Sequence, residues 1–114
     1  MKRDIRDFLN DIDAFAAKAE QLVNETPSQN LTQFSTEGMA LILAFQIIGE
    51  AVKNIPQEVK DKYPETPWKQ IAGMRDRLVH NYWSTSMLTI TETAKQHLGA
   101  LRTQVQLILK ELEQ

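Results

Sequence analysis

Apolar residues recur at spacings of three and four along four stretches of the chain, and this period predicts four long α-helices. The first helix is expected over residues 2–24, with one apolar stripe and a charged face opposite to it. The stripe consists of Ile5, Phe8, Leu9, Ile12, Phe15, Ala16, Ala19, Leu22 and Val23. A helix of this kind packs one side against a core and leaves the other side in water.

The second predicted helix, residues 37–55, is apolar on nearly every side. Such a helix belongs at the centre of a bundle. The loop before it is polar, and either Ser35 or Thr36 is suited to cap the free amides of its first turn. Gln46 and Glu50 lie within this apolar helix, so each of them needs a polar partner or a cavity.

Prolines set the bounds of the third predicted helix. Pro56 ends the second helix, and a short helical turn is expected before the next prolines. Thr66 is expected to cap the third helix, with Pro67 at its first position, where the missing N–H costs nothing. The helix then runs towards Tyr82, and Trp68 in its first turn is expected to be a packing anchor.

The last helix starts after Ser86 and places apolar residues at alternating steps of four and three, the rhythm of a coiled coil. Its seam consists of Met87, Thr91, Ala94, Leu98, Leu101, Val105, Ile108 and Leu112. No strand pattern or internal repeat is present. The sequence therefore predicts an all-α fold, an up-and-down four-helix bundle with an additional short helix, as a single domain over residues 1–114.

Composition narrows the possible chemistry. The chain has no cysteine, which excludes disulfides, thiolate catalysis and cysteine-bound metals. Its formal net charge of −2 argues against a broad nucleic-acid binder, yet residues 51–82 hold six basic and four acidic side chains. Lys69, Arg75 and Arg77 cluster there and are candidates for contacts with phosphates. The alternative is a solvated face of mixed charge.

Targeting features are lacking in the sequence. The N-terminal residues 1–13 carry charges at every turn and do not have the apolar stretch of a secretory signal. The most apolar run, residues 39–49, is well short of the ~20 residues that a bilayer demands. We therefore expect a cytoplasmic protein that does not enter a membrane.

Residues 73–83 concentrate the side chains that carry chemistry. At about 100° per residue, Arg75 and Tyr82 share one helix face, whereas Asp76 and His80 stack on the adjacent face. Asp76 is placed to accept a hydrogen bond from the imidazole, leaving the other ring nitrogen for proton transfer. Because His80 points about 140° away from Arg75, either the helix loosens or two copies of the chain serve one substrate. In the alternative without chemistry, Arg75 pairs with an acid, His80 caps the helix and Tyr82 belongs to the core.

The run R-D-R-L-V-H-N-Y, residues 75–82, resembles the motif of HEPN-domain ribonucleases, in which Arg, four residues, His, any residue and Tyr follow one another. Residues 45–55 and 63–83 resemble the HepT-type toxins of that family more specifically. The resemblance implies a HEPN-like helical domain that acts as a cytoplasmic toxin, forms homodimers and cuts RNA without a metal or another cofactor. Its expected partner is a minimal nucleotidyltransferase that serves as the antitoxin.

By motif position, the resemblance makes Arg75 and His80 catalytic and makes Tyr82 the tyrosine that the antitoxin can modify by adenylylation (AMPylation). The expected reaction is attack of an RNA 2′-hydroxyl on the adjacent phosphodiester. His80 would assist the proton transfers, and Arg75 would neutralise the charge that grows on the phosphoryl oxygens. One histidine cannot make both proton transfers at once, so a second His80 from a dimer is expected.

Four further residues are predicted to support this site. Glu50 is expected to form a salt bridge with Arg75 or another cation of the third helix, or else a simple polar contact. Asp76 is expected to orient the histidine, and Lys69 and Arg77 to bind RNA. A second function is also open: the chain can be a non-catalytic helical partner, or a nucleotide-binding subunit, of a nucleotidyltransferase.

Overall fold

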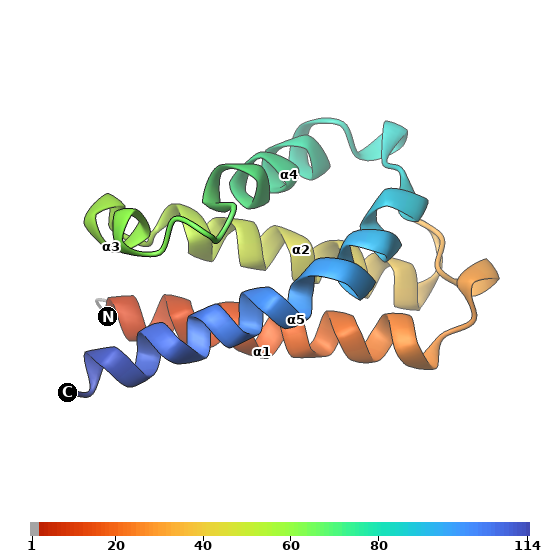
Figure 1. Ribbon diagram of the computed structural model, residues 1–114. Helices are drawn as coiled ribbons and strands as arrows, with labels where there is room; N and C mark the ends of the chain where they lie inside the picture. The colour runs from red at the N-terminus through yellow and green to blue at the C-terminus, as the bar shows by residue number, and fades with distance from the viewer. Residues whose placement is uncertain (1–2) are drawn as a thin grey trace.

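The protein consists of helices joined by short connections, and the computed structural model describes residues 3–114. Its elements are α1 (Ile5–Glu25), α2 (Thr36–Lys53), α3 (Gln57–Lys62), α4 (Trp68–His80) and α5 (Met87–Leu112), with two 3-10 turns, η1 (Ser28–Asn30) and η2 (Tyr82–Ser84). No strand occurs within residues 3–114, and the predicted all-α class is confirmed. The four longer helices alternate in direction, and α3 is the additional short helix (Figure 1).

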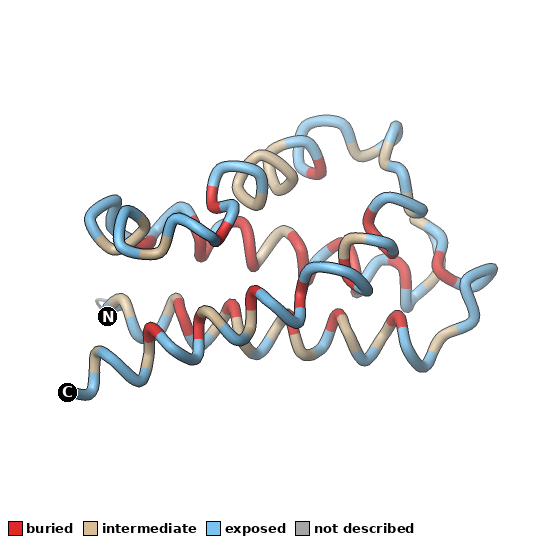
Figure 2. Tube along the Cα trace, viewed as in Figure 1, coloured by how far each residue is buried: buried red, intermediate tan, exposed pale blue. Residues whose placement is uncertain are grey.

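The hydrophobic core lies where α1, α2 and α5 face one another. α1 packs against both α2 and α5, and the buried positions of these helices point inward (Figure 2). The stripes predicted for the first and last helices are the ones that are buried or half-buried. The largest fully buried side chains are Leu9, Ile12, Leu41, Ile48, Val52, Val105 and Ile108. Burial of each contributes about 1.5–3 kcal/mol relative to exposure, so this core is the main source of stability.

Local capping explains where α1 and α2 begin. Asp4 and Asp7 form a capping box, in which each side chain accepts a hydrogen bond from the backbone N–H of the other, and α1 starts at Ile5. The predicted start at residue 2 lies outside the described residues. The Ser35 hydroxyl accepts a hydrogen bond from the Gly38 N–H at 3.0 Å, which confirms Ser35 as the cap of α2.

The prediction for the start of α4 is wrong. The helix begins at Trp68 rather than Pro67, and the hydroxyl of Thr66 is buried without a hydrogen-bond partner instead of capping the helix. Trp68 bonds to the segment that precedes α4. Its backbone N–H donates to the Thr66 carbonyl at 2.9 Å, and its indole N–H donates to the Tyr63 carbonyl at 3.1 Å. The buried Trp68 ring, predicted as a packing anchor, therefore fixes the chain before α4, and Thr66 turns its side chain into the protein.

The bundle is open between α4 and α5. α4 packs mainly against α2 and leans away from α5 (Figure 1). A cleft of about 910 Å³ lies between these two helices, and core side chains such as Phe45 and Leu98 contribute to its walls. The position of α4 is consequently decided by its contact with α2. Within the described residues, no helix combines the length and apolarity needed to span a bilayer.

Candidate active site

Arg75 lies in the middle of α4 and faces α2. One guanidinium nitrogen lies 3.2 Å from Oε2 of Glu50, and another donates a hydrogen bond to Oδ1 of Asp76 at 3.1 Å. The approach is close because Gly49 stands opposite: a Cβ on Gly49 would lie 2.1 Å from the Cβ of Arg75. The expected salt bridge between Glu50 and Arg75 is therefore present, and it depends on a glycine.

Asp76 is held by cations rather than by the histidine. Its carboxylate accepts hydrogen bonds from the ammonium of Lys53 on α2 and from the guanidinium of Arg75. These two hydrogen bonds, first that from Lys53, hold the pKa of Asp76 below its usual value. The predicted orienting contact between Asp76 and His80 is wrong, because a full positive charge within reach attracts the carboxylate more strongly than an imidazole.

Lys53 was not singled out by the sequence reasoning, although a signal for it was available. It follows Glu50 by three residues, and residues three apart on a helix lie on the same face. A residue of α4 that lies close to Glu50 is therefore also close to Lys53. The result is a cluster of two cations and two carboxylates, which we call the Arg75 cluster: Arg75, Lys53, Glu50 and Asp76.

His80 is the last residue of α4, and its side chain is exposed. The helix is continuous from Trp68 to His80, so the rotation of about 140° between Arg75 and His80 is retained. The helix does not loosen, which was one of the two ways in which these side chains were expected to meet. Within one copy of the chain they face different directions.

Tyr82 does not share a helix face with Arg75, because α4 ends before it and Tyr82 belongs to the 3-10 turn η2. Its hydroxyl donates a hydrogen bond to the backbone carbonyl of Gln33 at 2.5 Å, just before α2. Arg75 lies against Gly49, and the stretch of α2 from Thr36 to Gly49 is about 20 Å long at 1.5 Å per residue. The expectation that Tyr82 stands beside Arg75 is therefore wrong for a single copy.

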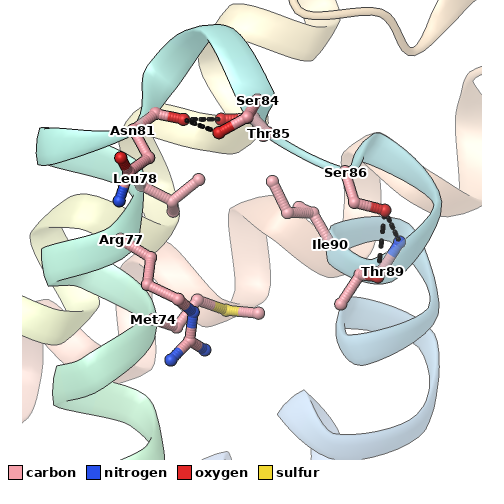
Figure 3. Close-up of a pocket in the computed structure, with 9 residues that line it drawn as sticks. All are labelled: Met74, Arg77, Leu78, Asn81, Ser84, Thr85, Ser86, Thr89 and Ile90. Atoms are coloured by element: carbon pink, nitrogen blue, oxygen red, sulfur yellow. Dashed lines mark hydrogen bonds between the residues drawn. The ribbon is translucent and has the colours of Figure 1, made fainter.

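The basic residues of α4 also separate. Arg75 turns towards α2, whereas Lys69 and Arg77 are exposed elsewhere on the helix, so the three do not form one patch. Arg77 lies along the wall of a hollow of about 320 Å³ between the end of α4 and the start of α5 (Figure 3). Met74, Leu78 and Ile90 also line this hollow, so its walls are mainly apolar. The hydroxyl groups of Ser84 and Ser86 at its rim are bonded to Asn81 and Thr89.

An exposed apolar strip borders the Arg75 cluster. Met39 and Leu43 lie four residues apart on α2, and Glu50 follows Leu43 at a spacing of seven, so all three lie on one face. On α4, Val79 follows Arg75 by one helical turn. Met39, Leu43 and Val79 are large apolar side chains, and all three are exposed.

Comparison with known proteins identifies the family. The family model described as “Ribonuclease HepT-like” matches residues 5–108, nearly the whole chain. The chain belongs to the ribonuclease HepT-like family.

Relatives of this HepT-like chain include proteins named as ribonucleases. “Putative RNase MJ0125” from Methanocaldococcus jannaschii is 38% identical over 116 residues, which cover 99% of this chain and 97% of the relative. “Probable ribonuclease HepT” from Thermococcus cleftensis is 35% identical over 102 residues, which cover 90% of this chain and 93% of the relative. No solved structure matches the chain at a comparable level of significance.

The chemistry available to this HepT-like chain comes from a guanidinium and an imidazole on one helix. No group of three or more His, Asp or Glu side chains within residues 3–114 is arranged to hold a metal ion. Arg75 offers a fixed positive charge for a phosphoryl oxygen, and His80 offers an exposed imidazole, the side chain that most often serves as a general acid or base. These are the two capabilities that cleavage of a phosphodiester requires.

Proposed function

We propose that this HepT-like protein is an endoribonuclease that needs no metal and acts in the cytoplasm as the toxin of a toxin–antitoxin pair. The observation that carries the proposal is the placement of Arg75 and His80 on one continuous helix, in the order of the family motif. Arg75 is kept in position by Glu50 and Asp76, while His80 is open to a substrate. The family membership supports RNA as that substrate.

The proposed enzyme is a homodimer with a composite site. Arg75 and His80 point about 140° apart within a copy, so one phosphodiester cannot meet both from the same helix. A two-fold axis through the exposed strip of Met39, Leu43 and Val79 would bury this strip and bring the α4 helices of two copies together. Both protomers would then supply catalytic residues to one cleft.

The proposed reaction is an internal transfer. One His80 takes the proton of the RNA 2′-hydroxyl, whose oxygen attacks the adjacent phosphorus, and the bond from phosphorus to the 5′-oxygen breaks. His80 of the partner subunit donates a proton to that leaving oxygen. Arg75 neutralises the negative charge that develops on the phosphoryl oxygens. The upstream product ends in a 2′,3′-cyclic phosphate, and the downstream product has a free 5′-hydroxyl.

The experiment that tests this function compares the two histidines of the chain. Purified wild type is expected to cut single-stranded RNA in excess EDTA and to leave 2′,3′-cyclic phosphate ends, as measured by gel electrophoresis and mass spectrometry. His80→Ala should lose at least about 100-fold in rate, a typical loss for a missing general acid–base group. His97→Ala, an exposed histidine on α5, is the matched control and should cut normally. Equal activity of both variants, or a free 3′-hydroxyl on the upstream fragment, contradicts the mechanism.

The proposed partner is a minimal nucleotidyltransferase that neutralises the toxin by adenylylating Tyr82. Because the Tyr82 hydroxyl donates to the Gln33 carbonyl, attachment of AMP must break this hydrogen bond and release η2 from the segment before α2. Tyr82→Phe keeps the ring and removes the acceptor. Co-expression with the nucleotidyltransferase should therefore add AMP mass to wild type and not to Tyr82→Phe. Full rescue of growth without any added mass indicates neutralisation by binding alone.

A further inference from the structure

Two aromatic rings from distant parts of the chain meet on the surface. Phe34 precedes α2, and Trp83 lies in η2 after α4. Their ring centroids are 6.3 Å apart, yet Phe34 is 68% exposed and Trp83 is 80% exposed. Aromatic side chains normally contribute to folding by being buried, so a pair that meets and stays in water is not explained by stability.

Tyr82 holds the segments that carry the two rings. The hydroxyl of Tyr82 donates to the Gln33 carbonyl and so ties the residue before Phe34 to the residue before Trp83. The Tyr82 ring also meets Trp83 edge-on, with centroids 5.6 Å apart and planes at 88°. The backbones that carry the two rings are therefore fixed, while the rings themselves stay open to solvent.

The surroundings of this aromatic pair suit a nucleic acid. Trp83 follows the proposed catalytic His80 by three residues. The same turn borders the hollow between α4 and α5, in which the Arg77 side chain extends away from the turn towards Met74 (Figure 3). Exposed aromatic rings are a means by which proteins hold unpaired bases, since every base has a face that stacks.

We propose that Phe34 and Trp83 form a stacking platform for an unpaired base of the RNA substrate. This inference rests on the proposed ribonuclease function and adds a specificity to it. A base that lies on the platform must leave its duplex, so the enzyme cuts single-stranded segments.

Binding can be tested apart from catalysis by tryptophan fluorescence. The chain has two tryptophans, and Trp68 is buried, so Trp83 reports on the surface. In the His80→Ala variant, a single-stranded oligoribonucleotide should quench the fluorescence, whereas the same sequence in a duplex should not. Trp68→Phe in this background assigns the signal to Trp83. Equal quenching by both RNAs, or none by either, overturns the platform.

Cleavage kinetics give the second measurement. Trp83→Ala and Phe34→Ala should each raise KM by roughly 5- to 100-fold with little change in kcat, as expected for the loss of one stacked base. Trp83→Phe keeps a ring and should recover most of the affinity. Leu88→Ala is the control, because Leu88 on α5 is also 70% exposed but does not belong to the aromatic pair. An unchanged KM in both alanine variants overturns the platform while cleavage by wild type still supports the ribonuclease.

Two other outcomes separate the alternatives. If Trp83→Ala converts a dimer into monomers in sedimentation experiments, the rings belong to the contact between copies of the chain and the platform is overturned. If wild type cuts no RNA but single-stranded RNA quenches Trp83, the ribonuclease proposal fails and the base-binding surface is supported.

Discussion

Two arginines of this protein are each held by two carboxylates, in two different parts of the fold. Arg102 on α5 bonds to Asp13 at 3.0 Å and to Glu20 at 3.1 Å, both on α1. Arg75 on α4 lies 3.2 Å from Glu50 and 3.1 Å from Asp76. The side chains are similarly exposed, 33% for Arg102 and 26% for Arg75. The distances of the two sites are therefore equivalent, but Glu50 and Asp76 are more exposed than Asp13 and Glu20.

Their surroundings differ. The hydrogen bonds that Arg102 donates to Asp13 and, second, to Glu20 raise the pKa of Arg102. This group of one cation and two carboxylates carries a net negative charge that repels phosphates. The Arg75 cluster includes Lys53, so its two cations and two carboxylates sum to zero charge. The helix α4, which carries Arg75, ends in the exposed His80. The geometry of an ion pair therefore does not separate the structural Arg102 from Arg75, which we propose to be catalytic. The two sites differ in the neighbouring groups, because Arg75 has a second cation, Lys53, beside it and an exposed His80 at the end of its helix.

The largest effect is expected from removing each arginine. Arg75→Ala should reduce RNA cleavage by roughly 100- to 1,000-fold, because a charge placed for the transition state is lost. Its melting temperature should change little. Arg102→Ala should keep its cleavage rate and lose roughly 1 kcal/mol of stability, the scale of partly exposed ion pairs. RNA cleavage assays measure the rates, and melting curves measure the stabilities of the two variants. A loss of activity in Arg102→Ala with full activity in Arg75→Ala would exchange the roles of the two arginines.

A smaller effect is expected when one carboxylate of each site is neutralised. Glu50→Gln removes one of the two groups that position the Arg75 guanidinium, and kcat should fall roughly tenfold because orientation is lost. Glu20→Gln, the matched change beside Arg102, should leave kcat unaltered. Steady-state kinetics on one RNA oligonucleotide decide this. Full activity of Glu50→Gln would show that Asp76 positions Arg75 by itself.

The smallest effect concerns pH. The pKa of Asp76 is lower in the folded protein than its ordinary value, so its stabilising contribution is complete above the ordinary value of about 3.9 and is lost as the pH falls through the lowered one. Wild type should therefore be more stable than Asp76→Asn at neutral pH, and the difference should disappear in strong acid. Urea unfolding at a series of pH values measures it. A difference that persists below both pKa values would point to a contact other than the ion pairs of Asp76.

The helices and the candidate residues can be read from the order of residues along the chain. Apolar period and capping are local properties, so the long helices, the cap at Ser35 and the buried anchor Trp68 were all predictable. A salt bridge of Glu50 with Arg75 was one of the contacts that the sequence left open for this carboxylate. Glu50 is exposed, so burial in an apolar helix is not the reason for the salt bridge. The order Arg75, His80, Tyr82 is likewise read directly from the chain.

Only the tertiary structure decided which of these residues meet. Lys53 and Asp76 are 23 residues apart, and their bond depends on which face of α2 receives α4, a choice made by Gly49. The end of α4 at His80 separates Tyr82 from the face of Arg75, and the Gln33 carbonyl then binds the tyrosine hydroxyl. The hydrogen bond between Tyr82 and Gln33 also brings their neighbours Trp83 and Phe34 together. Helical period operates over three or four residues, whereas the packing of α4 on α2 brings together groups that no local pattern connects.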